Sequence, residues 1–459
     1  MLKYFKDISF IALAVIIIAV TWTNFNLKRW KKQDVIKNDV VSYYAYLPAY
    51  FIYDDLSLSF LEGKEEYYHH KQQFWPEKTQ EGNYIIKTTM GMSFLYAPFF
   101  LIAYLTDDTI NEGAPGFSST YHKYIHLSSL FYFILGIFFL RKVLLRYFNR
   151  SSTAIALISI AIGTNLLYYT TAEAAMSHAY NFSLSILFIF LSILWHEKMK
   201  IRYALLLGLI GGLIVLIRPT NIIMIIFPLL LHVKDKETLL AKINLFKARI
   251  SHLLVATLIA FLVILPQLIY WKSVSGNYLF NSYVGERFYF TDPQIIEGLF
   301  SYRKGWLTYT PIMGFAIIGL ITLFRKHKAF FLPISLMTII AIYVVFSWWC
   351  WWYGGSFGMR PMIDFYGFLA IPLCAFFHTI ITQKTKVIKT ITLVLALVLI
   401  GFNIFQMQQY RGAIIHWDGM TKEAYWYSFG KYTIDDKEKY EQLIDRPDYK
   451  KAKFRNENE

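Results

Sequence analysis

Charged residues are scarce in this sequence. Asp, Glu, Lys and Arg together make up 17% of its 459 residues, whereas 56% of the residues are hydrophobic and 19% are aromatic. A soluble monomer tolerates exposed apolar patches of roughly a few hundred Å². A soluble protein with this composition would expose far more apolar surface than that. The low charge content therefore predicts an integral membrane protein.

Cysteine is nearly absent as well. The two cysteines, Cys350 and Cys374, both fall in or beside apolar segments. So few thiols in such places support neither a disulfide framework nor a zinc site.

Long uncharged apolar runs take up most of the chain instead. A perpendicular membrane-spanning helix needs roughly 20 apolar residues. The first run follows Lys3 and Lys6 and lacks a small-residue cleavage site, so it predicts an uncleaved anchor. Eleven runs of spanning or near-spanning length predict membrane helices. They are residues 8–25, 124–140, 153–169, 179–195, 203–217, 221–231, 253–270, 306–324, 329–346, 365–377 and 387–405.

Lys and Arg cluster at the ends of these runs, so the formal net charge of +15 does not predict a nucleic-acid-binding patch. Basic residues in short loops favour the cytoplasmic side. Counting the apolar run 91–105 as a further span would move the loop 141–150 outside, so this run predicts an interfacial or re-entrant segment. With the N-terminus inside, the basic loops all fall inside, at residues 141–150, 196–202, 234–249, 325–328 and 384–386.

The predicted fold is an all-α polytopic membrane protein with about eleven transmembrane helices. Residues 1–405 form its predicted catalytic part, in which a long first extracytoplasmic loop, residues 27–121, carries interfacial helices. Residues 406–459 form a polar extracytoplasmic tail. The outer loops lack an Asn-x-Ser/Thr glycosylation acceptor, which favours a bacterial source and hence a multi-pass protein of the plasma (inner) membrane.

Ionisable residues are almost missing from the predicted spans, which argues against an ion-coupled transporter and leaves the outer loops for chemistry.

After the first span, helical spacing places Asp39, Tyr43 and Tyr46 on one face. Asp39 is either a reactive carboxylate or a helix N-cap. Glu173 lies in an outer loop of small residues that gives a carboxylate little cover. His178 beyond it is either a substrate contact or a satisfied residue at a helix end.

Several cations fall on the outer side, against the positive-inside trend, and an anionic ligand is the simplest reason for them. Lys87 alternatively snorkels to the membrane interface, and Arg218 alternatively anchors a helix end there. Trp352 and Tyr353, beside glycines, either stack on a sugar or belong to an interfacial aromatic belt. The candidate phosphate-binding residues are Lys87, Arg218, Arg303, Lys304 and Arg360.

Together these features resemble the GT-C class of membrane glycosyltransferases, which includes protein O-mannosyltransferases and the aminoarabinose transferases of lipid A. The resemblance covers roughly residues 8–405 and lies in the order of first span, long outer loop with an early Asp, interfacial helices and helix bundle. Locally it rests on Asp39-Val40-Val41-Ser42-Tyr43-Tyr44, on Lys87, on Arg218-Pro219-Thr220-Asn221 and on Gly358-Met359-Arg360.

The resemblance implies a hexosyl- or pentosyltransferase that moves a sugar from a polyprenyl-phosphate carrier to an acceptor hydroxyl on the extracytoplasmic face. The acceptor would be a lipid, a glycan or a protein. In this class Asp39 would be the base or orient the acceptor, Glu173 would be the second acidic position, and Lys87 would contact the carrier phosphate. O-mannosyltransferases carry adjacent Asp-Glu, whereas Asn38 and Val40 flank Asp39 here, so protein mannosylation is not the expected activity.

No cofactor is firmly expected and no metal ligands are predicted, although a divalent metal serves some members of the class. The expected partners are the lipid-linked sugar donor, the acceptor and membrane lipids, with no nucleic acid. The alternative function is a glycan polymerase or ligase, or a lipid-carrier flippase. A flippase should present charges across the membrane, whereas the charges here lie at the outer ends of the spans.

Overall fold

The computed structural model describes residues 7–63, 74, 76–79, 82–108, 115–283, 285–383 and 385–454. Helices dominate this part of the chain. The strands found in it are the two-residue β1 (Glu77–Lys78) and β2 (Tyr84–Ile85), which pair antiparallel. The architecture of the described chain is therefore all-α, as predicted.

Seven helical segments of the described chain are long and apolar enough to cross a membrane. This confirms the predicted all-α membrane protein, whereas the number of eleven spans stays a prediction. The helices of these segments are α1 (Ile8–Leu27) with the short η1 (Arg29–Lys32), α6 (Ser119–Leu144), α9 (Ser177–Lys198), α13 (Ile250–Ser275), α17 (Lys328–Phe346), η6 (Arg360–Phe365) with α18 (Tyr366–Thr382), and α19 (Lys386–Arg411).

Shorter helices complete the bundle and its two ends. Four shorter apolar segments contain α5 (Gly91–Thr106), α7 (Arg150–Ala161), α10 (Ile201–Ile217), and η4 (Pro219–Ile225) with α11 (Ile226–Leu230). The remaining helices are α2 (Asp39–Tyr44), α3 (Tyr46–Phe51), η2 (Ser59–Leu61), α8 (Leu166–Thr171), α12 (Lys236–Ala248), α14 (Ile295–Phe300), α15 (Trp306–Tyr309), η5 (Pro311–Met313), α16 (Gly314–Lys326), α20 (Lys422–Ser428), α21 (Lys437–Gln442) and α22 (Tyr449–Lys453).

Two predicted spans are broken helices. The span predicted at 153–169 divides into α7 and α8 at Thr164 and Asn165, where Asn165 donates to the carbonyl of Phe357 and accepts from the hydroxyl of Tyr366. The span predicted at 306–324 divides into α15, η5 and α16 at Pro311, which lacks a backbone N–H. Both breaks place polar backbone inside the protein, where side chains or neighbouring turns satisfy it.

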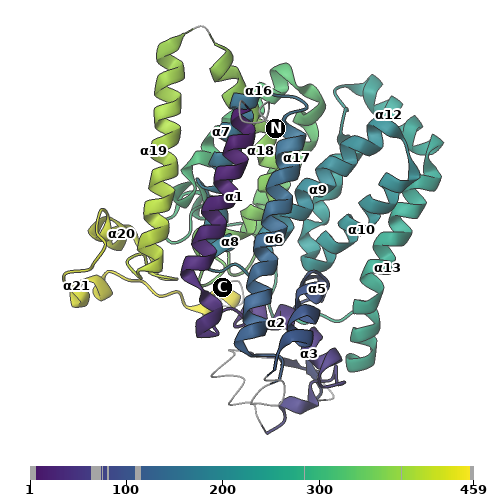
Figure 1. The fold of residues 1–459 in the computed structure, drawn as a ribbon, viewed down its shortest axis with the longest axis vertical. Coiled ribbons are helices and arrows are strands. Elements are labelled where there is room, and N and C mark those ends of the chain that lie inside the picture. The colour runs from purple at the N-terminus through teal and green to yellow at the C-terminus, as the bar shows by residue number, and fades with distance from the viewer. Residues whose placement is uncertain are drawn as a thin grey trace.

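Most long helices run side by side along the bundle (Figure 1). The first residues of α1 lie at the same end as α12, and α2 and α3 lie at the opposite end. The run predicted as interfacial forms the single helix α5, which packs against α6 and α10 toward that opposite end. Close packing uses small residues: Gly208 and Gly212 of α10 lie directly against Ala256 and Ala260 of α13.

The helix α19 extends to Arg411, beyond the expected start of the tail at residue 406. Its last turns are polar but buried, because Gln406 donates to the carbonyl of Thr308 and Gln409 to the carbonyl of Ser428. The tail then folds back and packs against the loop before α15 and the loop before η6. The tail therefore belongs to the surroundings of any site at this end of the bundle.

Candidate active site

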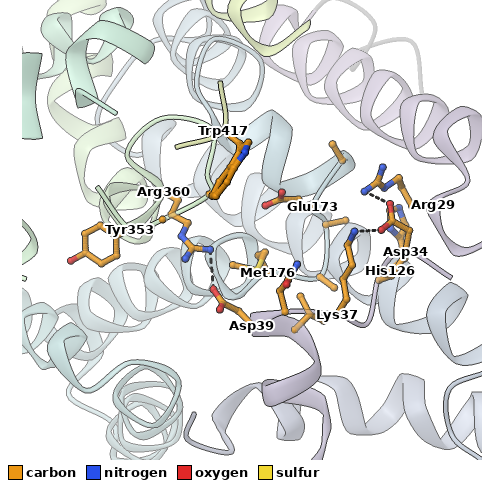
Figure 2. Close-up of a pocket in the computed structure, with 18 residues that line it drawn as sticks. Arg29, Asp34, Lys37, Asp39, His126, Glu173, Met176, Tyr353, Arg360 and Trp417 are labelled. Atoms are coloured by element: carbon orange, nitrogen blue, oxygen red, sulfur yellow. Dashed lines mark ion pairs between the residues drawn. The ribbon is translucent and has the colours of Figure 1, made fainter. Parts of the chain in front are cut away.

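A cavity of about 420 Å³ opens at the end of the bundle that carries α2 (Figure 2). Its wall comes from the start of α2, the loop between α8 and α9, the loop before η6, and the tail. Its charged lining residues are Arg29, Asp34, Lys37, Asp39, Glu173 and Arg360, and Tyr353, Trp417 and His126 also line it. Four of the residues expected from the sequence, Asp39, Glu173, Tyr353 and Arg360, thus share one cavity.

Asp39 and Arg360 form an ion pair across this cavity. Nη1 of Arg360 lies 3.0 Å from Oδ2 of Asp39, and 46% of the Asp39 side chain is exposed. Asp39 is the first residue of α2, while the N-cap is Asn38, in which φ is +54° and no side-chain capping bond forms. Asp39 lines the cavity, and the N-cap position of α2 belongs to Asn38 instead.

Glu173 lies on the wall of the same cavity, in the short loop after α8. Its Oε1 accepts a hydrogen bond from the hydroxyl of Tyr168 at 3.2 Å. Burial raises the pKa of Glu173, and the charge of Asp39 acts in the same direction, while Arg360 opposes them. A carboxyl whose pKa is raised suits proton exchange near neutral pH.

The other end of the cavity is basic, which was not predicted from the sequence. Arg29 and Lys37 both form ion pairs with Asp34, so three side chains leave one net positive charge (Figure 2). Behind them, Nε2 of the buried His126 contacts Oδ1 of Asn24 at 2.5 Å. The available signal was the basic cluster directly after the first span, on the side where Lys and Arg are disfavoured.

Four of the five predicted phosphate-binding residues do not line the cavity. Lys87 contacts Glu286, with Nζ 2.5 Å from Oε1, and Arg218 lies 3.6 Å from Oδ2 of Asp364. Arg303 and Lys304 both hold the tail. Arg303 lies 3.0 Å from Oδ2 of Asp445, and the buried Nζ of Lys304 donates to the carbonyls of Ser356 and Trp417. Of the five, Arg360 is the one that faces the carboxylates.

A fully buried carboxylate, Asp364, fixes the segment that presents Arg360. It accepts hydrogen bonds from Asn181 at 3.0 Å and Asn221 at 2.9 Å, and Nδ1 of His178 lies 3.0 Å from it. Because Asp364 and Arg360 belong to the same short helix η6, these bonds set the position of the guanidinium. His178 therefore contacts Asp364 rather than the cavity.

The predicted substrate-binding aromatics are divided between the cavity and the protein interior. Tyr353 lines the cavity. Tyr43 is buried close to Asp39, Arg218 and Arg360. Tyr46 donates to the carbonyl of Thr88 at 2.7 Å, away from the cavity.

Trp352 is also buried rather than in the cavity. Its ring packs against Tyr449 of the tail, with the centroids 5.6 Å apart. The aromatic residue that the tail contributes to the cavity is Trp417, which was not among the predicted substrate-binding residues.

A resident metal does not fit the donor set of the cavity. Within the described ranges, no three His, Cys, Asp or Glu side chains lie together as a metal site would require. Asp34 is neutralised by two cations, and Asp39 is paired with Arg360. The cationic side chains that line the cavity are Arg29, Lys37 and Arg360.

No family model and no curated protein sequence matches the chain. Among solved structures, the chain is similar to the oligosaccharyltransferase of Archaeoglobus fulgidus in its apo form, with a TM-score of 0.54 and 14% sequence identity. The match covers 97% of this chain and 61% of that one, so the chain spans less than two thirds of the length of its structural neighbour. At this identity the likeness concerns the fold, and the chain has the fold of the GT-C glycosyltransferases that its sequence resembles.

Proposed function

We propose that the chain is a glycosyltransferase that moves a sugar from a polyprenyl-phosphate carrier to an acceptor hydroxyl on the extracytoplasmic face. The observation that carries the proposal is the Asp39–Arg360 pair, which faces Glu173 in one cavity at the end of the bundle. An anion-binding guanidinium beside two carboxylates suits both halves of a displacement at an anomeric carbon. The fold shared with an oligosaccharyltransferase supports the same class of reaction.

In the proposed reaction the acceptor oxygen attacks the anomeric carbon while the bond from that carbon to the phosphate oxygen breaks. The electron pair of the broken bond leaves with the carrier phosphate, whose charge Arg360 neutralises. The acceptor proton passes to Asp39. Glu173, held by Tyr168, orients the acceptor hydroxyl.

The ion pair gives this mechanism an order of events. Before the donor binds, Arg360 holds Asp39 at 3.0 Å. A donor phosphate competes for the same guanidinium and displaces the Asp39 carboxylate from it. The released carboxylate then accepts the proton of the acceptor hydroxyl.

The location of the cavity suits a substrate with a lipid tail. On α5, which packs beside α2, the side chains of Leu101, Ile102 and Leu105 are exposed. An exposed apolar face next to a polar cavity lets an isoprenoid chain stay in hydrocarbon while its phosphate reaches the cations. The carrier therefore approaches along α5 in this proposal.

The test is transfer from a panel of radiolabelled polyprenyl-phosphate sugars to a membrane extract by the purified protein in lipid nanodiscs. Asp39→Asn should slow transfer by about 10²- to 10⁴-fold. Asp54→Asn is the matched control, because Asp54 is an exposed aspartate of the same loop that does not line the cavity.

Labelled product from wild type and Asp54→Asn, with its loss in Asp39→Asn, would support the proposal. Absence of transfer from every monophosphate donor would overturn it in favour of a flippase, polymerase or ligase. Equal transfer by Asp39→Asn and wild type would remove Asp39 from the chemistry.

A further inference from the structure

Trp417 is exposed at the cavity although the residues beside it are buried. Its side chain is 53% exposed, whereas Asp418 next to it is 1% exposed. In the view of Figure 2 its ring lies between Arg360 and Glu173, on the side of the cavity away from Asp39. An indole that is open to a polar cavity offers an apolar face on which a ligand ring can stack.

The backbone around Trp417 is held in place by partly buried hydrogen bonds. The carbonyl of Trp417 accepts from Nζ of Lys304 at 2.6 Å, and the carbonyl of Asp418 accepts from Arg303 at 3.3 Å. Oδ2 of Asp418 accepts from the hydroxyl of Tyr449 at 2.6 Å. These bonds anchor the tail at Trp417 and at the next residue, so the position of the ring is fixed by the folded protein.

The protein also makes room for the ring itself. A Cβ atom on Gly355 would lie 3.0 Å from Cε3 of Trp417, so the glycine allows the ring to lie close over the loop. His416 stacks beside it, with ring centroids 5.5 Å apart and an angle of 26° between the planes. A ring fixed this way loses little conformational entropy when it binds a ligand.

We infer that Trp417 stacks on the pyranose ring of the sugar donor and contributes to the affinity of the cavity for the sugar. The inference rests on the proposed function, because it assumes a donor phosphate at Arg360. The sugar is bonded directly to that phosphate, so a phosphate at the guanidinium brings the sugar ring beside Trp417. The C–H face of a pyranose is apolar and matches the open face of an indole.

The test compares the binding of two ligands, a polyprenyl phosphate that carries a sugar and the same polyprenyl phosphate without one. Binding is measured without acceptor and in the Asp39→Asn background, so that turnover of the ligand is suppressed. Trp417→Ala should weaken binding of the sugar-bearing ligand by about tenfold and leave binding of the sugarless carrier unchanged. Trp417→Phe should restore most of the difference, because the smaller ring still stacks.

Trp426→Ala is the matched control. Trp426 belongs to the same tail and is 54% exposed, but it does not line the cavity. Replacing it should change the affinity for neither ligand.

In an otherwise wild-type background, Trp417→Ala should also raise the KM for the donor more than it lowers kcat. An unchanged affinity ratio for the two ligands in Trp417→Ala would overturn the inference. A parallel loss of both affinities would also overturn it, since the tryptophan would then support the cavity rather than recognise the sugar. Failure of the wild-type protein to transfer sugar from any donor would instead reject the proposed function.

Discussion

Arg360 and Asp39 meet at 3.0 Å although one opens η6 near the end of the bundle and the other opens α2 just after the first span. In the proposed mechanism a donor phosphate replaces the Asp39 carboxylate on this guanidinium. The first prediction therefore concerns Arg360.

Replacing Arg360 should affect both donor binding and chemistry. Arg360→Gln removes the charge that neutralises the phosphate, so we expect a higher KM for the donor and a loss in kcat of about 10²- to 10³-fold. Arg360→Lys should recover part of the activity, since a point charge lacks the planar fork of a guanidinium. Steady-state kinetics would measure both effects. Arg446→Gln is the control, because Arg446 is exposed and pairs with Glu441 of the tail; a similar loss there would contradict a specific role for Arg360.

Glu173 should make stability depend on pH. Burial raises its pKa in the folded protein above the ordinary value of 4.5, so folding favours the protonated form. Its contribution is fully present below about pH 4.5 and is lost as the pH rises through the folded pKa. Glu173→Gln, which stays neutral, should therefore melt at the same temperature as wild type in acid and at a higher temperature near pH 8. Thermal unfolding in detergent across this range would show it, and a constant difference at every pH would refute it.

Lys304 should make the stability of the folded protein depend on pH above neutrality. Burial lowers its pKa to about 7 from 10.5, so the unfolded chain binds more protons than the folded one between these values. Stability should therefore rise as the pH increases from about 7 toward 10.5. Lys304→Met should abolish that rise and release the tail to proteases, because the carbonyls of Ser356 and Trp417 lose their donor. Limited proteolysis at pH 7 and 9 would test both effects, with Lys439→Met, on the exposed α21, as the control.

Chelation of metals should leave sugar transfer unchanged. The described residues offer no cluster of three metal-binding side chains, and the Asp39 carboxylate already forms an ion pair with Arg360. Transfer rates measured before and after dialysis against EDTA should agree within error. A loss of activity that Mg²⁺ or Mn²⁺ restores would show that the carboxylates bind a metal despite the ion pair.

The general fold could be predicted because the physics of a membrane span is local. Uncharged runs of sufficient length predict helices wherever they occur, as with α1 and α13. The breaks at Asn165 and Pro311 were missed because the spans were predicted from uncharged apolar runs, and neither residue interrupts such a run. Asn165 breaks its helix through bonds to residues about 200 positions away, which only the folded protein brings near.

The site was only partly predictable for the same reason. Asp39, Glu173 and Arg360 were predicted from their positions at the outer ends of spans, and the structure places all three at one cavity. Lys87 and Arg303 looked equivalent to Arg360 in the sequence, yet each has an acidic partner in a distant loop, Glu286 and Asp445. Asp364 was overlooked because it adjoins an apolar run, and its four partners come from two distant segments, α9 and residues 218–221.

The cavity takes its wall from segments that lie far apart in the chain, from Arg29 just after the first span to Trp417 in the tail. A ribosome makes Arg29 long before it makes Trp417. The first helices of a nascent chain can therefore enter the membrane while the cavity still lacks part of its wall. The cavity is complete only after the tail has been made and has docked on Lys304.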